Sequence, residues 1–220
     1  INDFFVEPLL ELIGQNGTVV VPTFTYSYIN NLVFDPINSH SKMMGILSET
    51  IRKDINSYRS YEPIFSVSAI GKNAKYFTSN VSKYCFGKNS FWERFLKMDG
   101  KLLGFNYGVA ATILHHFEWL LKVPYRNEKK FIGKSLIDGK LIENSAIYFC
   151  RNYNVSNNLR CFLGIEDLAK KKKIIKYSNL SRGYISLSDC QLLFKALAFA
   201  YSMDNYFLTV GRKIKIDDIV

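Results

Sequence analysis

The run from Thr18 to Thr25 constrains the fold more than any other segment of this 220-residue chain. It reads Thr-Val-Val-Val-Pro-Thr-Phe-Thr, a β-branched stretch of strand length with Pro22 near its end. β-Branched residues favour strands, and a strand that is apolar at successive positions is normally buried on both faces by helices. We therefore expect a sheet that is covered by helices.

The rest of the chain alternates between helical and strand patterns. Alternation over residues 131–163, with the turn Asp138-Gly139, predicts hairpin strands, and Gly211 predicts a closing hairpin between 207–210 and 214–216. The expected class is α/β to α+β, with a mixed central sheet flanked by helices in a single domain over residues 1–220. Helices are expected over 4–13, 45–52, 91–96, 112–121 and 188–202, with Ser90 and Thr112 as candidate N-caps. Gly71 starts a turn into a further helix that contains Ala74, Phe77 and Val81, and further strands are expected over 64–70 and 101–105.

Composition narrows the class of partner. Hydrophobic residues make up 48% of the chain and charged residues 22%, which excludes an intrinsically disordered protein. Lys and Arg total 29 against 19 Asp and Glu, and the net charge of +10 favours nucleic acid, a lipid surface or a phosphorylated small molecule as partner. The four cysteines form no Cys-x-x-Cys pair, and no apolar run reaches the roughly 20 residues that a membrane span needs. These features predict reduced thiols and a cytoplasmic protein.

Only three histidines are available as a neutral imidazole base. His115 is the best placed, since it lies in the first turn of a helix that follows a strand and a loop, where α/β proteins commonly bind ligands. Glu118 shares a helix face with His115 and is placed to orient the ring or to bind an ammonium group. An ordinary histidine at the edge of the core with an i,i+3 partner would show the same spacing, and that alternative stays open here.

Two other chemistries use the same residues. His115 and Glu118 supply two metal ligands, and His40 or Asp35 is a candidate third, but no recognisable spacing supports that third ligand. A cysteine nucleophile paired with His115 is also conceivable. None of the cysteines lies in a loop that is typical of a nucleophile, so we interpret them as core residues.

The basic run over residues 170–176 has two interpretations. It is either a patch for nucleic acid or, as such runs more often are, a solvated face. The glycines and aromatic residues of a module that binds RNA or single strands are missing from it. The chain also contains no P-loop and no Gly-x-Gly-x-x-Gly motif.

Several segments in order over residues 15–130 resemble one family, the aminoglycoside 3-N-acetyltransferases, also called antibiotic N-acetyltransferases. The family signature Thr-x-Leu-His-x-x-Glu is matched by Thr112-Ile-Leu-His115-His-Phe-Glu118. Beyond residue 131 the resemblance is weak, although 183–187 is similar to the entry to a late helix. The other matching residues are Gly17 to Thr25, Phe34, Asp35, Pro36, Ser39, Ser41, Gly45, Glu49, Arg59, Ser60, Pro63, Ser66, Ala69, Gly71, Phe86, Gly87, Ser90, Pro124 and Arg126.

The resemblance implies a fold that differs from the common GNAT acetyltransferases and begins before residue 1. The family has a strand and part of its CoA site ahead of the segment that matches Ile1. The chain also opens directly on a helical pattern without an initiator Met. We therefore expect a domain over 1–220 that lacks an N-terminal strand and a helix start.

The activity that the resemblance implies is direct transfer of acetyl from acetyl-CoA to an amine, without a metal. His115 would be the general base, Glu118 would orient it or bind the amino sugar, and Thr112 or a backbone N–H would stabilise the oxyanion. Acetyl-CoA is the expected co-substrate. Its expected contacts are Thr23, Thr25, Arg59, Ser60, Ser66 and the helix that starts near Ser90.

The identity of the acceptor stays open at this point. Aminoglycosides are polycations, and an acidic cleft on this basic chain would have to come from residues such as Asp35, Glu49, Glu62 and Glu118. An amino sugar carried on a nucleotide diphosphate explains the net charge better. The competing class is a basic domain that binds nucleic acid or a membrane surface without catalysis.

Overall fold

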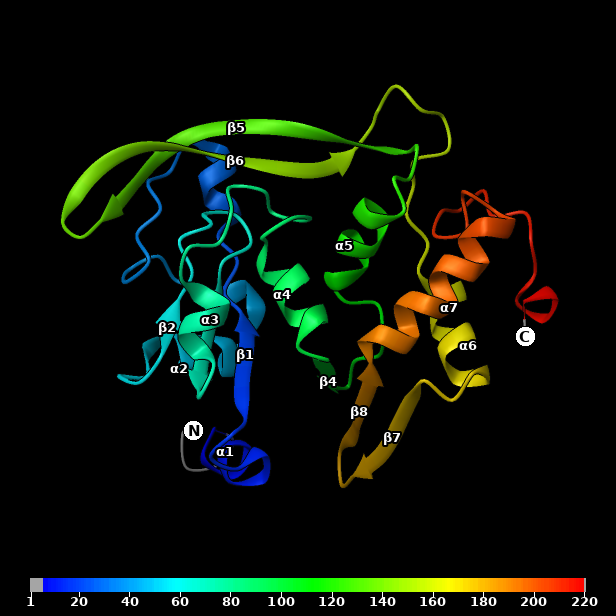
Figure 1. Ribbon diagram of the computed structural model, residues 1–220, viewed down its shortest axis with the longest axis horizontal. Coiled ribbons are helices and arrows are strands. Elements are labelled where there is room, and N and C mark those ends of the chain that lie inside the picture. Colours follow the sequence, from blue (N-terminus) through cyan, green and yellow to red (C-terminus); the bar gives the residue numbers. More distant parts are fainter. Residues whose placement is uncertain (1–5, 220) are drawn as a thin grey trace. The chain divides into compact units, whose positions relative to one another are not determined.

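The computed structural model describes residues 6–219, and its chain groups into two units (Figure 1). Unit 1 comprises residues 1–91 and 129–148, and unit 2 comprises 92–128 and 149–220. The single domain that the sequence predicts over 1–220 stays a prediction. The predicted helix over 4–13 lies partly outside the described residues, and its described part is α1 (Glu7–Ile13), which ends at Gly14 with φ 66°.

Unit 1 is built on a small antiparallel sheet in the order β1-β3-β2. β3 (Val67–Gly71) lies between β1 (Thr18–Pro22) and β2 (Tyr58–Arg59). Its central position explains why β3 is buried at residues 67–70, whereas in β1 only Val21 is buried. The expectation that the Thr18 strand is buried on both faces was therefore wrong, because β1 lies at the edge of this sheet.

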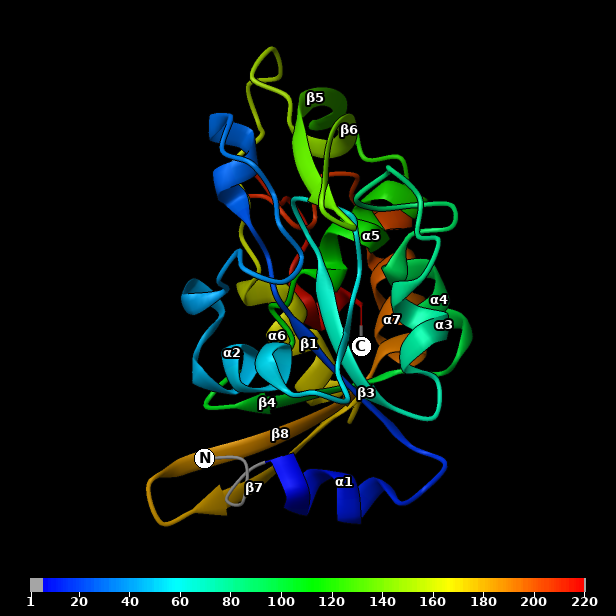
Figure 2. The same cartoon turned by 90° about the vertical axis from the view of Figure 1, so that its left-hand side faces the viewer.

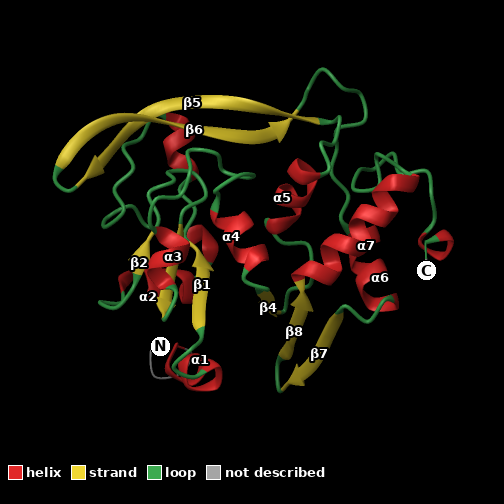
Figure 3. Cartoon of the chain, in the orientation of Figure 1, coloured by secondary structure: helices red, strands yellow, loops and turns green. Residues whose placement is uncertain are grey.

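Short helices surround the sheet of unit 1 (Figure 3). The predicted helix over 45–52 corresponds to α2 (Ile46–Lys53). The helix predicted after the turn at Gly71 is α3 (Ala74–Thr78), which contains Phe77 but ends before Val81. Two 3-10 turns, η2 (Tyr26–Asn30) and η3 (Lys42–Met44), lie between β1 and α2. A core cluster is formed by Val6, Val21, Ile51 and Ile70.

The predicted hairpin is confirmed. β5 (Arg126–Ile137) and β6 (Lys140–Arg151) pair with each other across the turn Asp138-Gly139. Both turn residues have positive φ, 50° and 75°, which is the backbone of a tight primed turn. Within unit 1, the Tyr28 hydroxyl donates to the carbonyl of Asn144 in β6 at 3.0 Å.

Unit 2 contains a second antiparallel sheet in the order β4-β8-β7, which can be followed in Figure 2. Its strands are β4 (Lys101–Phe105), β7 (Ile175–Leu180) and β8 (Gly183–Asp189). The helices of this unit are α4 (Phe91–Lys97), α5 (Ile113–Leu120), α6 (Leu163–Lys171) and α7 (Cys190–Met203). α7 begins after Asp189, whose carboxylate accepts the Leu192 N–H at 2.9 Å.

The C-terminal part of unit 2 differs from expectation. The closing hairpin around Gly211 was wrong, since the described chain there turns around the buried Asp204 and ends in the 3-10 turn η4 (Ile216–Asp218). The Asp204 carboxylate accepts the Lys213 N–H at 2.6 Å, so backbone groups bond a side chain instead of a paired strand.

The predicted α/β to α+β class is confirmed, but its strands are distributed differently. Where we expected one central sheet, the described strands form two three-stranded sheets and a hairpin. α6, β7 and β8 were not predicted, because the lysine run obscured the apolar side of α6 and five of the six β7 residues are exposed. Within residues 6–219, no helix is long and apolar enough to cross a membrane.

Candidate active site

The loop between β4 and α5 positions the predicted base. Asn106 begins the loop with φ 50°, and its side-chain oxygen accepts the Tyr184 N–H of β8 at 2.8 Å. Gly183 permits this approach, since a Cβ there would overlap the Asn106 amide. The loop therefore leaves the sheet at a fixed point and enters α5 directly after Thr112.

The middle of this loop is held by an acid on α6. The Glu166 carboxylate accepts the Val109 N–H at 2.9 Å and also bonds the Tyr177 hydroxyl. A Cβ on Gly108 would overlap that carboxylate, so the glycine makes the contact possible. Glu166 thereby fixes the segment that precedes His115.

α5 is buried along most of its length, from Ile113 to Glu118. His115 and Glu118 lie on one face, as their spacing predicted, and His115 Nδ1 is 2.6 Å from Glu118 Oε2. A carboxylate at this distance accepts a proton from Nδ1, which places the ring's lone pair on Nε2. This tautomer is the one that a general base needs at Nε2.

Arg126 completes the cluster from the start of β5. Its Nε lies 2.6 Å from the same Glu118 Oε2, as an ion pair whose N–H does not align for a hydrogen bond. Its Nη1 donates to the carbonyl of Phe149 at 3.0 Å. Glu118 Oε1 and the buried Tyr125 hydroxyl have no hydrogen-bond partner among the described residues. The buried carboxylate therefore has one oxygen shared by two cationic or proton-donating groups.

Electrostatics keep the His115 ring neutral near pH 7. Burial lowers the pKa of His115, the Glu118 carboxylate raises it in part, and the charges of Arg126 and Arg160 lower it further. A neutral ring accepts a proton, so the direction of this shift suits a base at physiological pH. Burial and the nearby Glu118 charge also raise the pKa of Tyr125, which stays a phenol.

Thr112 and the other two histidines do not join the His115–Glu118 contact. Thr112 occupies the N-cap position, but its backbone is already helical and its side chain makes no capping bond, so the N-cap prediction was wrong for the hydroxyl. His116 is stacked parallel to Trp119, and burial lowers its pKa to about 4. His40, the third histidine, is exposed in unit 1.

The predicted CoA residues of unit 1 form a tightly bonded cluster around Arg59. Its Nη1 donates to the carbonyls of Pro36 (3.1 Å) and Ser39 (2.6 Å), and its Nη2 to that of Thr23 (2.6 Å). Its Nε donates to Ser66 Oγ at 3.2 Å. Ser66 Oγ in turn donates to the Thr23 carbonyl at 2.7 Å. The structure brings Thr23, Arg59 and Ser66 together, with their bonds directed inward.

Thr25, Ser60 and Ser90 are also buried and bonded to the backbone. Thr25 Oγ1 donates to the Pro63 carbonyl at 2.9 Å, and Ser90 Oγ donates to that of Gly87 at 2.7 Å. Ser60 Oγ accepts the Val67 N–H at 2.9 Å. CoA contacts for these residues stay predictions.

The three acids of unit 1 that were candidates for an acidic cleft bond to groups of their own unit. Glu49 accepts from Arg52, which holds the pKa of this carboxyl well below its usual range. Glu62 is buried and accepts the N–H groups of Ile64 (3.1 Å) and Phe65 (2.6 Å). Burial nevertheless raises the pKa of Glu62 to about 7. Asp35 accepts the N–H groups of Ile37 and Asn38 in its own turn.

The structure also bears on the two other chemistries that the sequence left open, a metal site and a cysteine nucleophile. No group of three or more His, Cys, Asp or Glu residues that suits a metal ion occurs in the described part of the chain. The four cysteines form no disulfide; Cys85 and Cys190 are buried, and burial raises the pKa of Cys190 to about 12. A thiol with so high a pKa is a poor nucleophile at neutral pH.

Comparison with known proteins identifies the family. A family model described as aminoglycoside 3-N-acetyltransferase matches residues 2–200. The chain belongs to this family. Aminoglycoside N(3)-acetyltransferase III from Pseudomonas aeruginosa is 28% identical over 112 residues, which are 50% of this chain and 41% of that protein. The match therefore spans less than half of this curated relative.

Solved structures confirm the fold that was expected for an aminoglycoside 3-N-acetyltransferase. AAC-IIIb, solved as a binary complex with CoASH, has a TM-score of 0.76 at 20% identity, over 88% of this chain and 80% of that one. The AAC(3)-IVa apoenzyme has a TM-score of 0.72 at 24% identity, over 92% of this chain and 75% of that one. YokD from Bacillus subtilis has a TM-score of 0.70 at 14% identity, over 86% and 80%.

Two residues that shape the candidate site were given no role from the sequence. Arg126 was only a matching position, and its contact with Glu118 depends on where β5 begins. Glu166 lies on a helix that was not expected. Gly108, which admits the Glu166 carboxylate, was the only local signal, because a glycine in a loop often marks a close approach.

Proposed function

We propose that the chain carries an acetyl-CoA-dependent N-acetyltransferase that acetylates the amino group of an amino sugar by direct transfer. The observation that carries this proposal is the buried contact between His115 Nδ1 and Glu118 Oε2, in a chain of the aminoglycoside 3-N-acetyltransferase family. A neutral imidazole that is oriented by a carboxylate is the arrangement that a general base requires.

The proposed proton path starts at the acceptor amine. His115 Nε2 takes a proton from the amine as its nitrogen attacks the carbonyl carbon of the acetyl thioester. The N–C bond forms, the C–S bond breaks, and CoA leaves as a thiolate that recovers a proton from the imidazolium or from water. No oxidant or metal is needed to balance this step.

Glu118 and Arg126 act on the proposed base through its Nδ1 side. Glu118 is a positioning residue, since it touches the ring through Nδ1 and would stabilise the imidazolium as it forms. Arg126 contacts the same oxygen and holds the carboxylate in place. Thr112, half-buried one turn before His115, is the proposed hydroxyl donor to the oxyanion, and a backbone N–H is the alternative.

Support for acetyl-CoA as co-substrate comes from a relative, because AAC-IIIb was solved with CoASH. The proposed contacts are Thr23, Thr25, Arg59, Ser60, Ser66 and Ser90. The bonds of Arg59 all go to its own unit, so its guanidinium fits a role in shaping the surrounding loops better than a role in holding a phosphate.

Two acceptor classes fit the proposal. Relatives of this chain are named for aminoglycosides, and one AAC(3)-IVa structure was solved in complex with apramycin. The charges near His115 favour a less cationic acceptor, because Arg126 and Arg160 both act on its ring. An amino sugar linked to a nucleotide diphosphate would match these charges and the net charge of +10.

An acceptor screen tests the activity. The chain is incubated with acetyl-CoA and either aminoglycosides or nucleotide-linked amino sugars, and thiol release is followed together with the mass of the product. We expect acetylation of one acceptor class at a single amino group. If acetyl-CoA neither supports transfer nor raises the melting temperature, the enzyme proposal fails. In that outcome, tight binding of RNA or of anionic vesicles would favour the non-catalytic alternative.

A further inference from the structure

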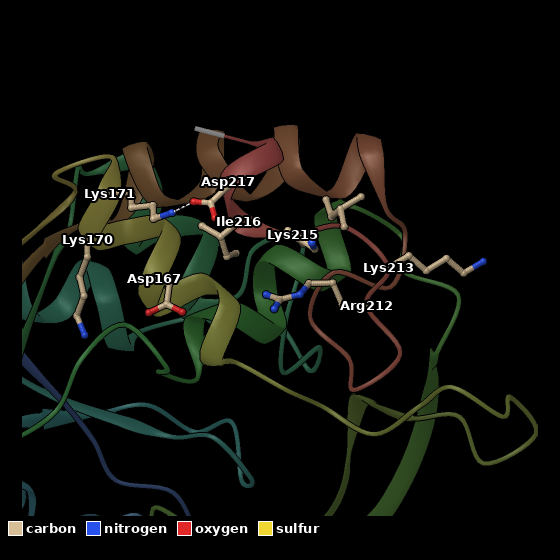
Figure 4. A pocket seen from close by; sticks show the side chains of 9 residues that line it. Asp167, Lys170, Lys171, Arg212, Lys213, Lys215, Ile216 and Asp217 are labelled. Carbon is tan, nitrogen blue, oxygen red and sulfur yellow. Dashed lines mark hydrogen bonds and ion pairs between the residues drawn. The ribbon is translucent and has the colours of Figure 1, made fainter.

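Unit 2 contains a basic pocket that the proposed chemistry does not use. Its volume is about 640 Å³, and it is lined by the C-terminal half of α6 and by residues 212–217 (Figure 4). Five basic and two acidic side chains contribute to its lining, together with Ile214 and Ile216. Its charged residues are Asp167, Lys170, Lys171, Arg212, Lys213, Lys215 and Asp217.

Arg212 is the best placed cation of this pocket. Its side chain is half-buried, stacks over the Phe207 ring at 5.5 Å and is directed toward α6 (Figure 4). Gly164 on α6 makes room for it, because a Cβ there would overlap Nη1. Among the described residues, no carboxylate or carbonyl accepts a hydrogen bond from its guanidinium. Five donors in a planar fork are thus held at the pocket without a protein acceptor.

The wall that carries Arg212 is fixed by backbone bonds. The buried Asp204 carboxylate accepts the N–H groups of Lys213 (2.6 Å) and Ile214 (3.4 Å), and Ile216 is buried below. The cations are therefore presented by a preorganised segment, which lowers the entropic cost of binding a ligand.

The acids of the pocket differ in their partners. Asp217 forms an ion pair with Lys171, so its charge is compensated. Asp167 is exposed, and within residues 6–219 its carboxylate forms no ion pair or hydrogen bond. Lys170 lies 3.7 Å from Glu166 and over the Tyr177 ring, and Lys213 points away from the pocket (Figure 4). Arg212 and Lys215 are consequently the cations available to a ligand.

We infer that this pocket binds a small phosphorylated sugar, with its phosphate on Arg212 and Lys215 and a hydroxyl on Asp167. A guanidinium fork matches two phosphate oxygens, and a nearby ammonium adds a point charge. A carboxylate would repel the phosphate itself but accepts a hydroxyl that lies beside it. A concave pocket with an uncompensated carboxylate also disfavours the continuous phosphate backbone of a nucleic acid.

Binding of ribose 5-phosphate tests this inference. Isothermal titration of the whole chain, saturated with CoA to occupy the proposed co-substrate site, should show one ribose 5-phosphate site and no binding of ribose. Arg212→Gln should weaken binding at least about tenfold, as expected for loss of a charge-assisted bidentate contact. Lys140→Gln, which removes an equal charge at the exposed hairpin turn, is the matched control and should bind as the wild type does.

Two further variants test the geometry of the pocket and the role of its carboxylate. Gly164→Ala should displace the Arg212 tip and weaken binding without loss of a charge, because the overlap involves the end of a flexible side chain. Asp167→Asn should remove the preference for ribose 5-phosphate over inorganic phosphate. The inference is overturned if CoA abolishes binding, if Arg212→Gln and Gly164→Ala bind normally, or if a short single-stranded oligonucleotide binds more tightly through Arg212.

Discussion

Two clusters of polar side chains, one in each unit, carry the residues that the sequence pointed to, and they differ in how their hydrogen bonds are distributed. Around Arg59, four donated bonds end on the carbonyls of Pro36, Ser39 and Thr23 and on the Ser66 hydroxyl. Around His115, a single Glu118 oxygen contacts both the imidazole and Arg126, and Glu118 Oε1 has no hydrogen-bond partner among the described residues.

The difference indicates two kinds of role. A cluster in which each donor ends on a backbone carbonyl or hydroxyl of its own unit stabilises loops, and losing a member leaves buried carbonyls without partners. A cluster in which a proton position depends on one shared carboxylate oxygen is suited to proton transfer. The predictions below separate stability from activity for the two clusters.

The largest effect is expected from His115→Ala. Removal of a general base should lower kcat/KM for acetyl transfer by about 10²–10⁴-fold, because base catalysis contributes that much. Steady-state kinetics measure the loss. The melting temperature should fall as well, because the change removes a buried side chain and takes a partner from Glu118, so circular dichroism verifies that the variant is folded. His116→Phe on the same helix is the matched control and should keep most of the activity. Full activity in His115→Ala would remove His115 from the mechanism.

Arg59→Ala should act on stability instead. Three carbonyls and one hydroxyl in a part-buried region lose their donor, and we expect the free energy of unfolding to fall by about 3 kcal/mol. Urea unfolding of Arg59→Ala measures the total loss in the free energy of unfolding. The same measurement on Arg59→Lys, which keeps the charge, gives the part of that loss that depends on the planar guanidinium. Unchanged stability with weakened CoA binding would instead place Arg59 on the ligand, as the resemblance implied.

The two units should also respond to pH in opposite directions. Glu62 in unit 1 has a pKa raised from 4.5 to about 7, so the folded state holds a proton that the unfolded state releases, and stability falls as pH rises through this window. His116 in unit 2 has a pKa lowered from 6.5 to about 4, so the unfolded state gains the proton, and stability rises with pH. Each slope is about 1.4 kcal/mol per pH unit.

Between pH 4.5 and 6.5 these two slopes cancel, and single variants should reveal them. Glu62→Gln should leave stability that rises with pH, with His115 acting in the same direction because its pKa is also lowered. His116→Phe should shift the slope toward stability that falls with pH, because the Glu62 contribution is then opposed only by that of His115. Urea unfolding at several pH values measures both slopes, and equal slopes in the two variants would contradict the assignment.

The smallest effect is expected from Glu166→Gln. The amide keeps the size of the side chain but weakens the bond to the Val109 N–H by about 1 kcal/mol, so the loop before His115 is held less firmly. A loss of about fivefold in kcat with an unchanged pH profile is expected. Glu143→Gln, at an exposed acid of β6, is the matched control and should keep wild-type activity. Activity at the wild-type level would show that the loop does not depend on Glu166.

Local patterns predicted the parts of the molecule that depend on local chemistry. The Asp138-Gly139 turn and the shared face of His115 and Glu118 follow from residue type and spacing, and the structure has both. Interactions between segments that are distant in the sequence could not be predicted from it. Arg126 meets Glu118 only because β5 begins there, and α6 was hidden because its lysines interrupt the apolar pattern.

Arg126 has a consequence for how this hairpin can change length over evolution. Its guanidinium connects Glu118 of α5 to the Phe149 carbonyl of β6, at the open end of the hairpin. Insertions or deletions of residue pairs near Asp138-Gly139 would alter the tip and leave that end in register, whereas a one-residue slip would turn side chains to the opposite face. The tip can therefore diversify among relatives while the carboxylate behind His115 keeps its position.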